Sequence, residues 1–202
     1  MTTMTTNLRS TLFTLTLAAA AGLAGCHRAP PVTGDFTGIA LPQHSIHIAH
    51  LDVYLHFTWQ PSHAWYAHET EWAMPFGRHI EIKHHFVLAP GESDAPMRLY
   101  LLAKAAGKGD EVADTLMRSP FAASDPDETL VATAYLASRF GLRKEFDDST
   151  DDPAMREQLA AVGQTQQQLQ FEPTLILNKQ MMFAGDAKNA SEIVASALTS
   201  TR

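Results

Sequence analysis

The stretch Glu172-Pro173-Thr174-Leu175-Ile176-Leu177-Asn178-Lys179 decides the fold class of this chain. A proline stands directly before a short apolar run, Thr174 to Leu177, which is typical of a buried strand. Asn178-Lys179 predicts a turn, and Gln180 to Ala184 follows as the hairpin partner. A final helix is expected to be capped at Asn189-Ala190-Ser191-Glu192. The chain therefore ends in two strands and a helix.

Two earlier segments alternate between apolar and polar residues, which is the pattern of half-buried strands. The first runs from His50 to Trp59 and the second from His79 to Leu88, where Pro90-Gly91 turns the chain. Between them, Ala64 to Trp72 has helical spacing. The polar side of the first strand consists of His50, Asp52, Tyr54, His56 and Thr58.

The middle of the chain is predicted to be helical. Asp125-Pro126-Asp127-Glu128 combines a cap residue, a proline in the first turn and an acidic residue three positions after the cap. Asp152-Pro153 predicts another helix, with Gln164 to Gln170 as its exposed continuation. The predicted order is strand, helix, strand, several helices, two strands and a helix, which is an α/β protein.

This order, together with Glu172 to Lys179, resembles the DsbA-like branch of the thioredoxin superfamily. The resemblance implies a thioredoxin fold, a mixed central sheet flanked by helices, with an inserted helical domain. It places the thioredoxin-like domain at 46–96 and 171–202 and the insertion at 97–170. It also implies that Pro173 stands at the family's cis proline, beside which an extended chain can pair with free backbone groups.

The sequence departs from the family where redox chemistry takes place. Active members carry Cys-x-x-Cys, often Cys-Pro-His-Cys, at the end of the first core strand, and here Pro61-Ser62-His63-Ala64 stands there. His63 matches the family's histidine, but no sulfur is present. Because thiol–disulfide exchange needs an attacking and a resolving thiol, we expect no catalytic residue and no cofactor.

The N-terminus predicts an envelope lipoprotein. Residues 1–25 have a charged start, an apolar middle and small residues at the end, as in a secretory signal. Leu23-Ala24-Gly25-Cys26 resembles the lipobox of bacterial lipoproteins, which implies lipidation of Cys26 and a tether over 26–45. His27-Arg28, in place of an aspartate, implies a periplasmic protein anchored to the outer membrane.

Length, charge and cysteine content limit the possible domains, partners and sites of the chain. The chain has 202 residues, 45% of them hydrophobic, which suffices for one domain with an insertion. Its formal net charge of −7 argues against nucleic acid as a partner. Its one cysteine excludes an intrachain disulfide and a multi-cysteine zinc site.

Two catalytic or metal-binding interpretations receive weaker support. Ser62 and His63 are adjacent and lack a third orienting group, so a nucleophile and base are not predicted. Ser62 is instead expected to cap a helix that begins near His63. The histidines are spaced too widely along each strand to share an ion, and only His56 and His85 are left as weak cross-strand candidates for a metal.

The leading expectation is a redox-inactive, lipid-anchored protein that binds an extended envelope polypeptide or a partner protein beside Pro173. His63, Glu172 and Thr174 would line the groove, with Trp59 as part of its apolar floor, and Glu172 would favour basic partners. One alternative is a metal-binding or metal-delivery lipoprotein that uses His56, His63, His84 or His85. The other is a thiol:disulfide interchange protein by ancestry only.

Overall fold

The computed structural model describes residues 48–119, 125–170 and 173–199, and every structural statement below concerns these residues. The strands are β1 (Ala49–Leu55), β2 (Ile80–Phe86), β3 (Thr174–Leu177) and β4 (Met181–Ala184). The helices are α1 (Gln60–Ala73), α2 (Ala95–Ala105), α3 (Gly109–Met117), α4 (Pro126–Arg139), α5 (Arg143–Asp148), α6 (Pro153–Gln166) and α7 (Ala187–Thr199). A 3₁₀ segment, Met74–His79, links α1 to β2.

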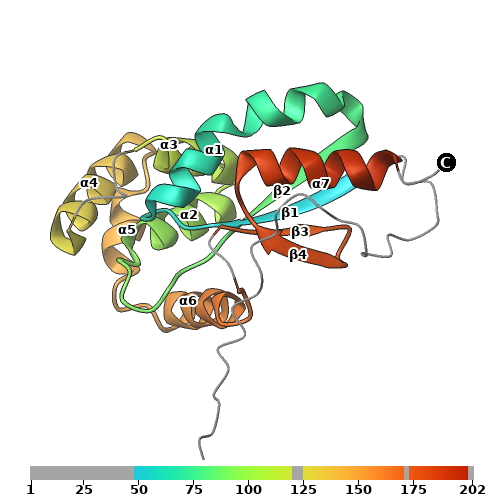
Figure 1. Ribbon diagram of the computed structural model, residues 1–202. Helices are drawn as coiled ribbons and strands as arrows, with labels where there is room; N and C mark the ends of the chain where they lie inside the picture. The colour runs from blue at the N-terminus through green and yellow to red at the C-terminus, as the bar shows by residue number, and fades with distance from the viewer. Residues whose placement is uncertain (1–47, 120–124, 171–172, 200–202) are drawn as a thin grey trace, which may run out of the picture. The chain divides into compact units, whose positions relative to one another are not determined.

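The four strands form one mixed sheet in the order β2-β1-β3-β4 (Figure 1). β1 pairs parallel with β2 and antiparallel with β3, which pairs antiparallel with β4. Asn178 and Lys179 have φ angles of 50° and 60° at the hairpin, as a turn that matches strand twist requires. The α/β class and the thioredoxin fold with helices between β2 and β3 are confirmed.

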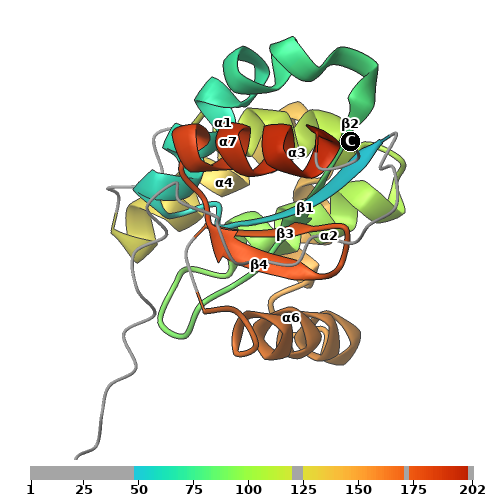
Figure 2. The same cartoon turned by 45° about the vertical axis from the view of Figure 1, so that its right-hand side comes forward.

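The alternation of β1 separates the two faces of the sheet. Leu51, Val53 and Leu55 are buried, whereas Asp52 and Tyr54 are half-buried. Helices α1 and α7 cover one face, and α6 lies on the opposite side of the sheet (Figures 1 and 2). On the α1 side, the rings of Trp65 and Trp72 pack 5.0 Å apart in the core, because the seven-residue spacing places both on one helix face.

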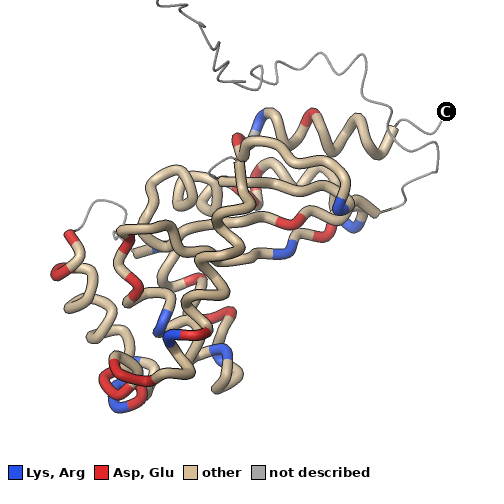
Figure 3. Tube along the Cα trace, turned by 90° about the horizontal axis from the view of Figure 1, so that it is seen from below, with Lys and Arg blue, Asp and Glu red and all other residues tan. Residues whose placement is uncertain are grey.

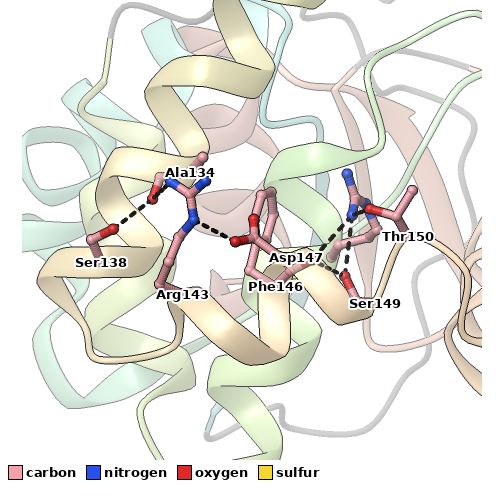
Figure 4. A network of polar contacts seen from close by, with 8 residues as sticks. Ala134, Ser138, Arg143, Phe146, Asp147, Ser149 and Thr150 are labelled. Atoms are coloured by element: carbon pink, nitrogen blue, oxygen red, sulfur yellow. Dashed lines mark hydrogen bonds and ion pairs between the residues drawn. The ribbon is translucent and has the colours of Figure 1, made fainter.

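Buried Arg98 on α2 links this helix to α5 and to the turn that follows α5. Its guanidinium donates hydrogen bonds to Ser149 Oγ at 3.1 Å and Thr150 Oγ1 at 2.8 Å, and lies 4.7 Å from the centre of the Phe146 ring. Figure 4 shows Phe146, Ser149 and Thr150 side by side at the end of α5. Because each bond links α2 to a residue about 50 positions later, this cluster fixes α5 against α2.

Several boundaries differ from the sequence predictions. β1 ends at Leu55, not Trp59, and α1 begins at Gln60, because Pro61 in a first helical turn needs no backbone N–H partner. The final helix begins at Ala187, and Asp186 Oδ1, not Asn189, accepts the capping bond. The predicted continuation of α6 is right in exposure at Gln164, Gln167, Gln168 and Gln170, but the helix ends at Gln166, whose side chain is buried. The short helix α5 had not been predicted.

Candidate functional site

A polar cluster lies where β1 leads into α1, at the sheet end where β3 begins. Tyr54 pairs with Thr174 across β1 and β3. Continuing this antiparallel register by one residue places Pro173 opposite Leu55, next to the start of the cluster. The cluster consists of His56, Thr58, Ser62 and Glu92, and we call it the α1 cluster.

Glu92, in the loop between β2 and α2, is the centre of the α1 cluster. His56 Nδ1 lies 2.8 Å from Glu92 Oε2, and the backbone N–H of Ala89 donates to the same oxygen at 2.7 Å. Thr58 Oγ1 donates to Glu92 Oε1 at 2.8 Å. The His56 side chain is 2% exposed and the Glu92 side chain 18%. Both carboxylate oxygens are therefore occupied, and the loop is bound to the end of β1.

Burial and hydrogen bonding act in opposite directions on Glu92. Burial raises its pKa, because a carboxylate loses hydration in the protein. The hydrogen bonds from His56, Ala89 and Thr58, together with charge on His56, outweigh burial and leave the pKa of Glu92 lowered. Glu92 is therefore held as an anion, and its contacts are those of a residue that stabilises this corner of the fold.

Ser62 and His63 do not act on each other. Ser62 is fully buried, and its Oγ accepts a hydrogen bond from the backbone N–H of His56 at 3.0 Å. His63 Nε2 instead donates to the backbone carbonyl of Phe57 at 2.7 Å. The predicted cap at Ser62 is wrong, since Trp59 is the N-cap residue and no side chain caps α1. The first turn of α1, Gln60 to His63, contains no sulfur.

The predicted groove residues fall into two groups. Trp59 is half-buried, and its ring meets the edge of the His56 ring at a centroid distance of 5.7 Å. Like Trp59, Pro61 and His63 are half-buried, and Ala64 is exposed, so all four reach the surface at the start of α1.

Pro173, in contrast, is buried, and its carbonyl oxygen accepts a hydrogen bond from the Gly185 N–H at 2.8 Å. Thr174 is fully buried and pairs with β1 and β4, so its predicted place in an open groove is wrong. Glu172 and Cys26 lie outside the described residues, together with the predicted segments 1–25 and 26–45. Because Glu172 is not described, the prediction of a cis peptide bond before Pro173 is not tested.

The histidines that could have bound a metal have separate partners. His85 Nε2 lies 2.7 Å from Asp52 Oδ1, and His84 Nε2 lies 2.6 Å from Glu69 Oε2 on the opposite face. His56 and His63 bond Glu92 and Phe57, as described above. The structure does not bring His56 and His85 to a common carboxylate, and the described residues contain no group of three or more His, Cys, Asp or Glu suited to a metal ion.

Two surface properties complete the description. None of the helices in the described ranges is both long and apolar enough to cross a membrane. Acidic residues gather around the turn between α5 and α6 (Figure 3), where the sequence has Asp147, Asp148, Asp151 and Asp152. Arg143 and Lys144 on α5 form ion pairs with Asp147 and Asp148, so the negative charge of this turn is partly balanced.

Comparison with known proteins places the fold in a known group. The chain is similar to DsbA from Xylella fastidiosa, with a TM-score of 0.53 and 15% identity over 77% of this chain and 86% of that chain. A thioredoxin-like oxidoreductase from Silicibacter pomeroyi gives a TM-score of 0.57 and 17% identity over 74% and 86%. No family model matches the sequence, and no curated protein does. The chain therefore has a DsbA-like thioredoxin fold, shown by its structure and not by sequence identity.

Proposed function

We propose that this chain is a redox-inactive DsbA-like protein that binds an extended polypeptide or a partner protein around Trp59 and Pro173. The observation that carries the proposal is the first turn of α1, which holds a serine bonded within the protein but no sulfur. The only cysteine of the chain is Cys26, in the N-terminal segment. A dithiol cycle needs two sulfurs, so the proposal assigns this fold a binding role in place of thiol exchange.

The polar contacts at the start of α1 support a binding role. His63 is fixed by its bond to the Phe57 carbonyl, and Trp59 is packed against the His56 ring, yet both side chains reach the surface. A rigid aromatic residue that is only half-buried loses little conformational entropy on binding, and tryptophan is common among the residues that dominate binding energy.

The binding experiment compares Trp59→Ala with Tyr135→Ala, which removes an aromatic ring that is 66% exposed on α4. The probe is a reduced, carboxymethylated and therefore unfolded polypeptide, with binding to the full chain followed by fluorescence anisotropy. We expect affinity to fall about tenfold for Trp59→Ala, as for the loss of a binding anchor, and to stay unchanged for Tyr135→Ala. Equal affinities for both variants would contradict the proposed site.

Glu172 provides a second variant of the same experiment. Glu172→Lys should weaken the binding of a basic unfolded polypeptide, and more strongly at low salt, because charge attraction is screened by ions. A loss of the same size at every ionic strength would show that Glu172 does not act through its charge.

The redox-inactive part of the proposal has an independent test. The purified full chain should reduce insulin no faster than buffer with the same concentration of thiol reductant. Activity above this background, retained in Cys26→Ser, would overturn the claim of inactivity, because that variant contains no cysteine sulfur at all.

The proposed location is the periplasm, with lipidated Cys26 as an anchor in the outer membrane. The lipobox resemblance of Leu23-Ala24-Gly25-Cys26 supports it. Cys26→Ser should move the protein from the membrane fraction to the soluble periplasmic fraction, since the acyl chains supply the anchorage. An unmodified Cys26 thiol on the mature wild-type protein, detected by mass spectrometry, would exclude the anchor.

A further inference from the structure

A cavity of about 420 Å³ opens beside β2, the edge strand of the sheet, where α2 and α6 approach it. Its lining residues are Tyr54, Lys83, His84, His85, Phe86, Val87, Met97, Tyr100, Leu101, Lys104, Val162 and Thr165. The volume lies within the range of small-molecule sites in proteins. The cavity shares no residue with the α1 cluster, so what it binds does not depend on the function proposed above.

The charged side chains that line this cavity have the sign opposite to the net charge of the chain. The formal net charge of the protein is −7, yet the lining contains two lysines, Lys83 and Lys104, and no Asp or Glu. A second cavity, of about 650 Å³, lies on the other side of Lys83 and differs in this respect, because Asp52 and Glu81 line it together with Lys83 and Lys179. The smaller cavity is therefore the one whose chemistry favours an anion.

The register of the sheet explains why Lys83 is available. Asp52 lies directly across from Lys83 in the β1–β2 pairing and would be its natural partner. The Asp52 carboxylate instead accepts a hydrogen bond from His85 Nε2 at 2.7 Å. Among the residues that the structure describes, neither Lys83 nor Lys104 forms an ion pair. Both ammonium groups can therefore meet an anion from outside.

The aromatic and aliphatic side chains of the lining favour an anion that also carries a flat apolar ring. The rings of Tyr54 and His85 are stacked, with centroids 4.7 Å apart and an angle of 14° between their planes. Tyr100 adds a third ring, packed edge-on against Phe86 at 4.9 Å. Met97, Leu101 and Val162 complete the apolar wall. Aromatic rings of this kind bind another ring by stacking or by edge-to-face contact.

We propose that this cavity binds a small aromatic carboxylate. The ring of the ligand lies against Tyr54 and Tyr100, and its carboxylate faces Lys83 and Lys104 at the mouth. Two lysines can each donate a charge-assisted hydrogen bond to a carboxylate, and these are stronger than bonds between neutral groups.

The experiment is titration calorimetry of the full chain at neutral pH with 4-hydroxycinnamate, its neutral amide and octanoate. We expect one-to-one binding of the aromatic anion, and binding about tenfold weaker for the amide, which lacks the charge. Octanoate should also bind at least about tenfold more weakly, because it has the charge without the ring. These three titrations need no variant.

Substitutions then locate the site. Lys83→Gln and Lys104→Gln should each weaken the binding of 4-hydroxycinnamate by about threefold to tenfold, and the double variant should abolish it. Lys188→Gln, at an exposed position on α7, is the matched control and should leave binding unchanged. Thermal melting of each variant checks that the fold is retained.

Four results would overturn the proposal. They are no binding of 4-hydroxycinnamate at millimolar concentration, equal binding of its amide, equal binding of octanoate, and an equal loss of affinity in Lys188→Gln.

Discussion

A histidine–carboxylate pair lies near each end of β1, and the two pairs differ in burial. His50 Nδ1 is 2.9 Å from Glu81 at one end, with side chains 60% and 62% exposed. Just beyond the other end, His56 Nδ1 is 2.8 Å from Glu92, with side chains 2% and 18% exposed. The contacts are alike in chemistry and length, but water can replace a lost partner only in the exposed pair.

The comparison shows that a short distance does not measure the contribution of a pair to stability. Glu92 also accepts bonds from Thr58 and from the backbone of Ala89, so it ties its own loop to the segment that links β1 to α1. Glu81 is directly opposite His50 in the β1–β2 register, where the sheet already holds the two residues together. The buried pair is therefore expected to stabilise the α1 cluster, whereas the exposed pair is expected to add little to the stability of the sheet.

The largest effect is expected from Glu92→Ala. It leaves the buried His56 ring, the Thr58 hydroxyl and the Ala89 N–H without their acceptor, and should lower the free energy of unfolding by about 2–4 kcal/mol. Urea denaturation of the full chain measures it. A loss no larger than that of Glu81→Ala would remove the distinction between the two pairs.

Ser62→Ala should have the next largest effect. The buried Ser62 Oγ is the acceptor for the backbone N–H of His56, and its removal should cost about 1–2 kcal/mol of stability. Ser138→Ala is the matched control, because its hydroxyl is exposed and bonds the carbonyl of Ala134 within α4 (Figure 4). If urea denaturation gives the same small change for both, the bond between Ser62 and His56 contributes little.

The third prediction concerns the contribution of Glu92 to the pH dependence of stability. Its pKa in the folded protein is lowered from the ordinary value of 4.5, so it binds a proton less readily when folded than when unfolded. Its contribution is therefore complete above that value and is lost as pH falls through the lower folded pKa. Glu92→Gln should make the decline of stability between about pH 5 and 3 less steep. An unchanged acid slope would show that Glu92 has no preferential charge stabilisation.

The smallest effect is expected from Glu81→Ala. The pair with His50 is well exposed, so its removal should change the free energy of unfolding by less than about 0.5 kcal/mol, and less still at high salt. Denaturation at two ionic strengths measures both quantities. A loss above about 1 kcal/mol would mean that the exposed pair is coupled to the sheet more tightly than its solvation indicates.

Local signals predicted much of the fold. Asp125 and Asp152 cap α4 and α6 as expected, because a cap bonds N–H groups only two or three residues ahead. The turn at Asn178-Lys179 follows from two residues with positive φ angles between apolar runs. The alternation from His50 to Leu55 identified the buried face of β1, because side chains point to opposite faces in turn.

The α1 cluster could not be predicted in the same way. Pro61 interrupts the alternating pattern, so the sequence predicts a helix that begins near His63 or Ala64, three to four residues after the observed start at Gln60. Ser62 has the residue type of a cap but serves as an acceptor for His56. Glu92 follows a Pro-Gly turn, which predicts a bend in the chain but not the contact with a histidine 36 positions away.

The sequence by itself determined that no Cys-x-x-Cys pair stands at the start of α1, because its 202 residues contain one cysteine, Cys26. It also determined the order of strands and helices, since these arise from spacing along the chain. The tertiary structure alone decided which carboxylate meets which histidine, and that Lys83 is left without Asp52. The physical reason is that pairing across a fold depends on where segments far apart in sequence meet, and desolvation at that place sets the strength of the contact.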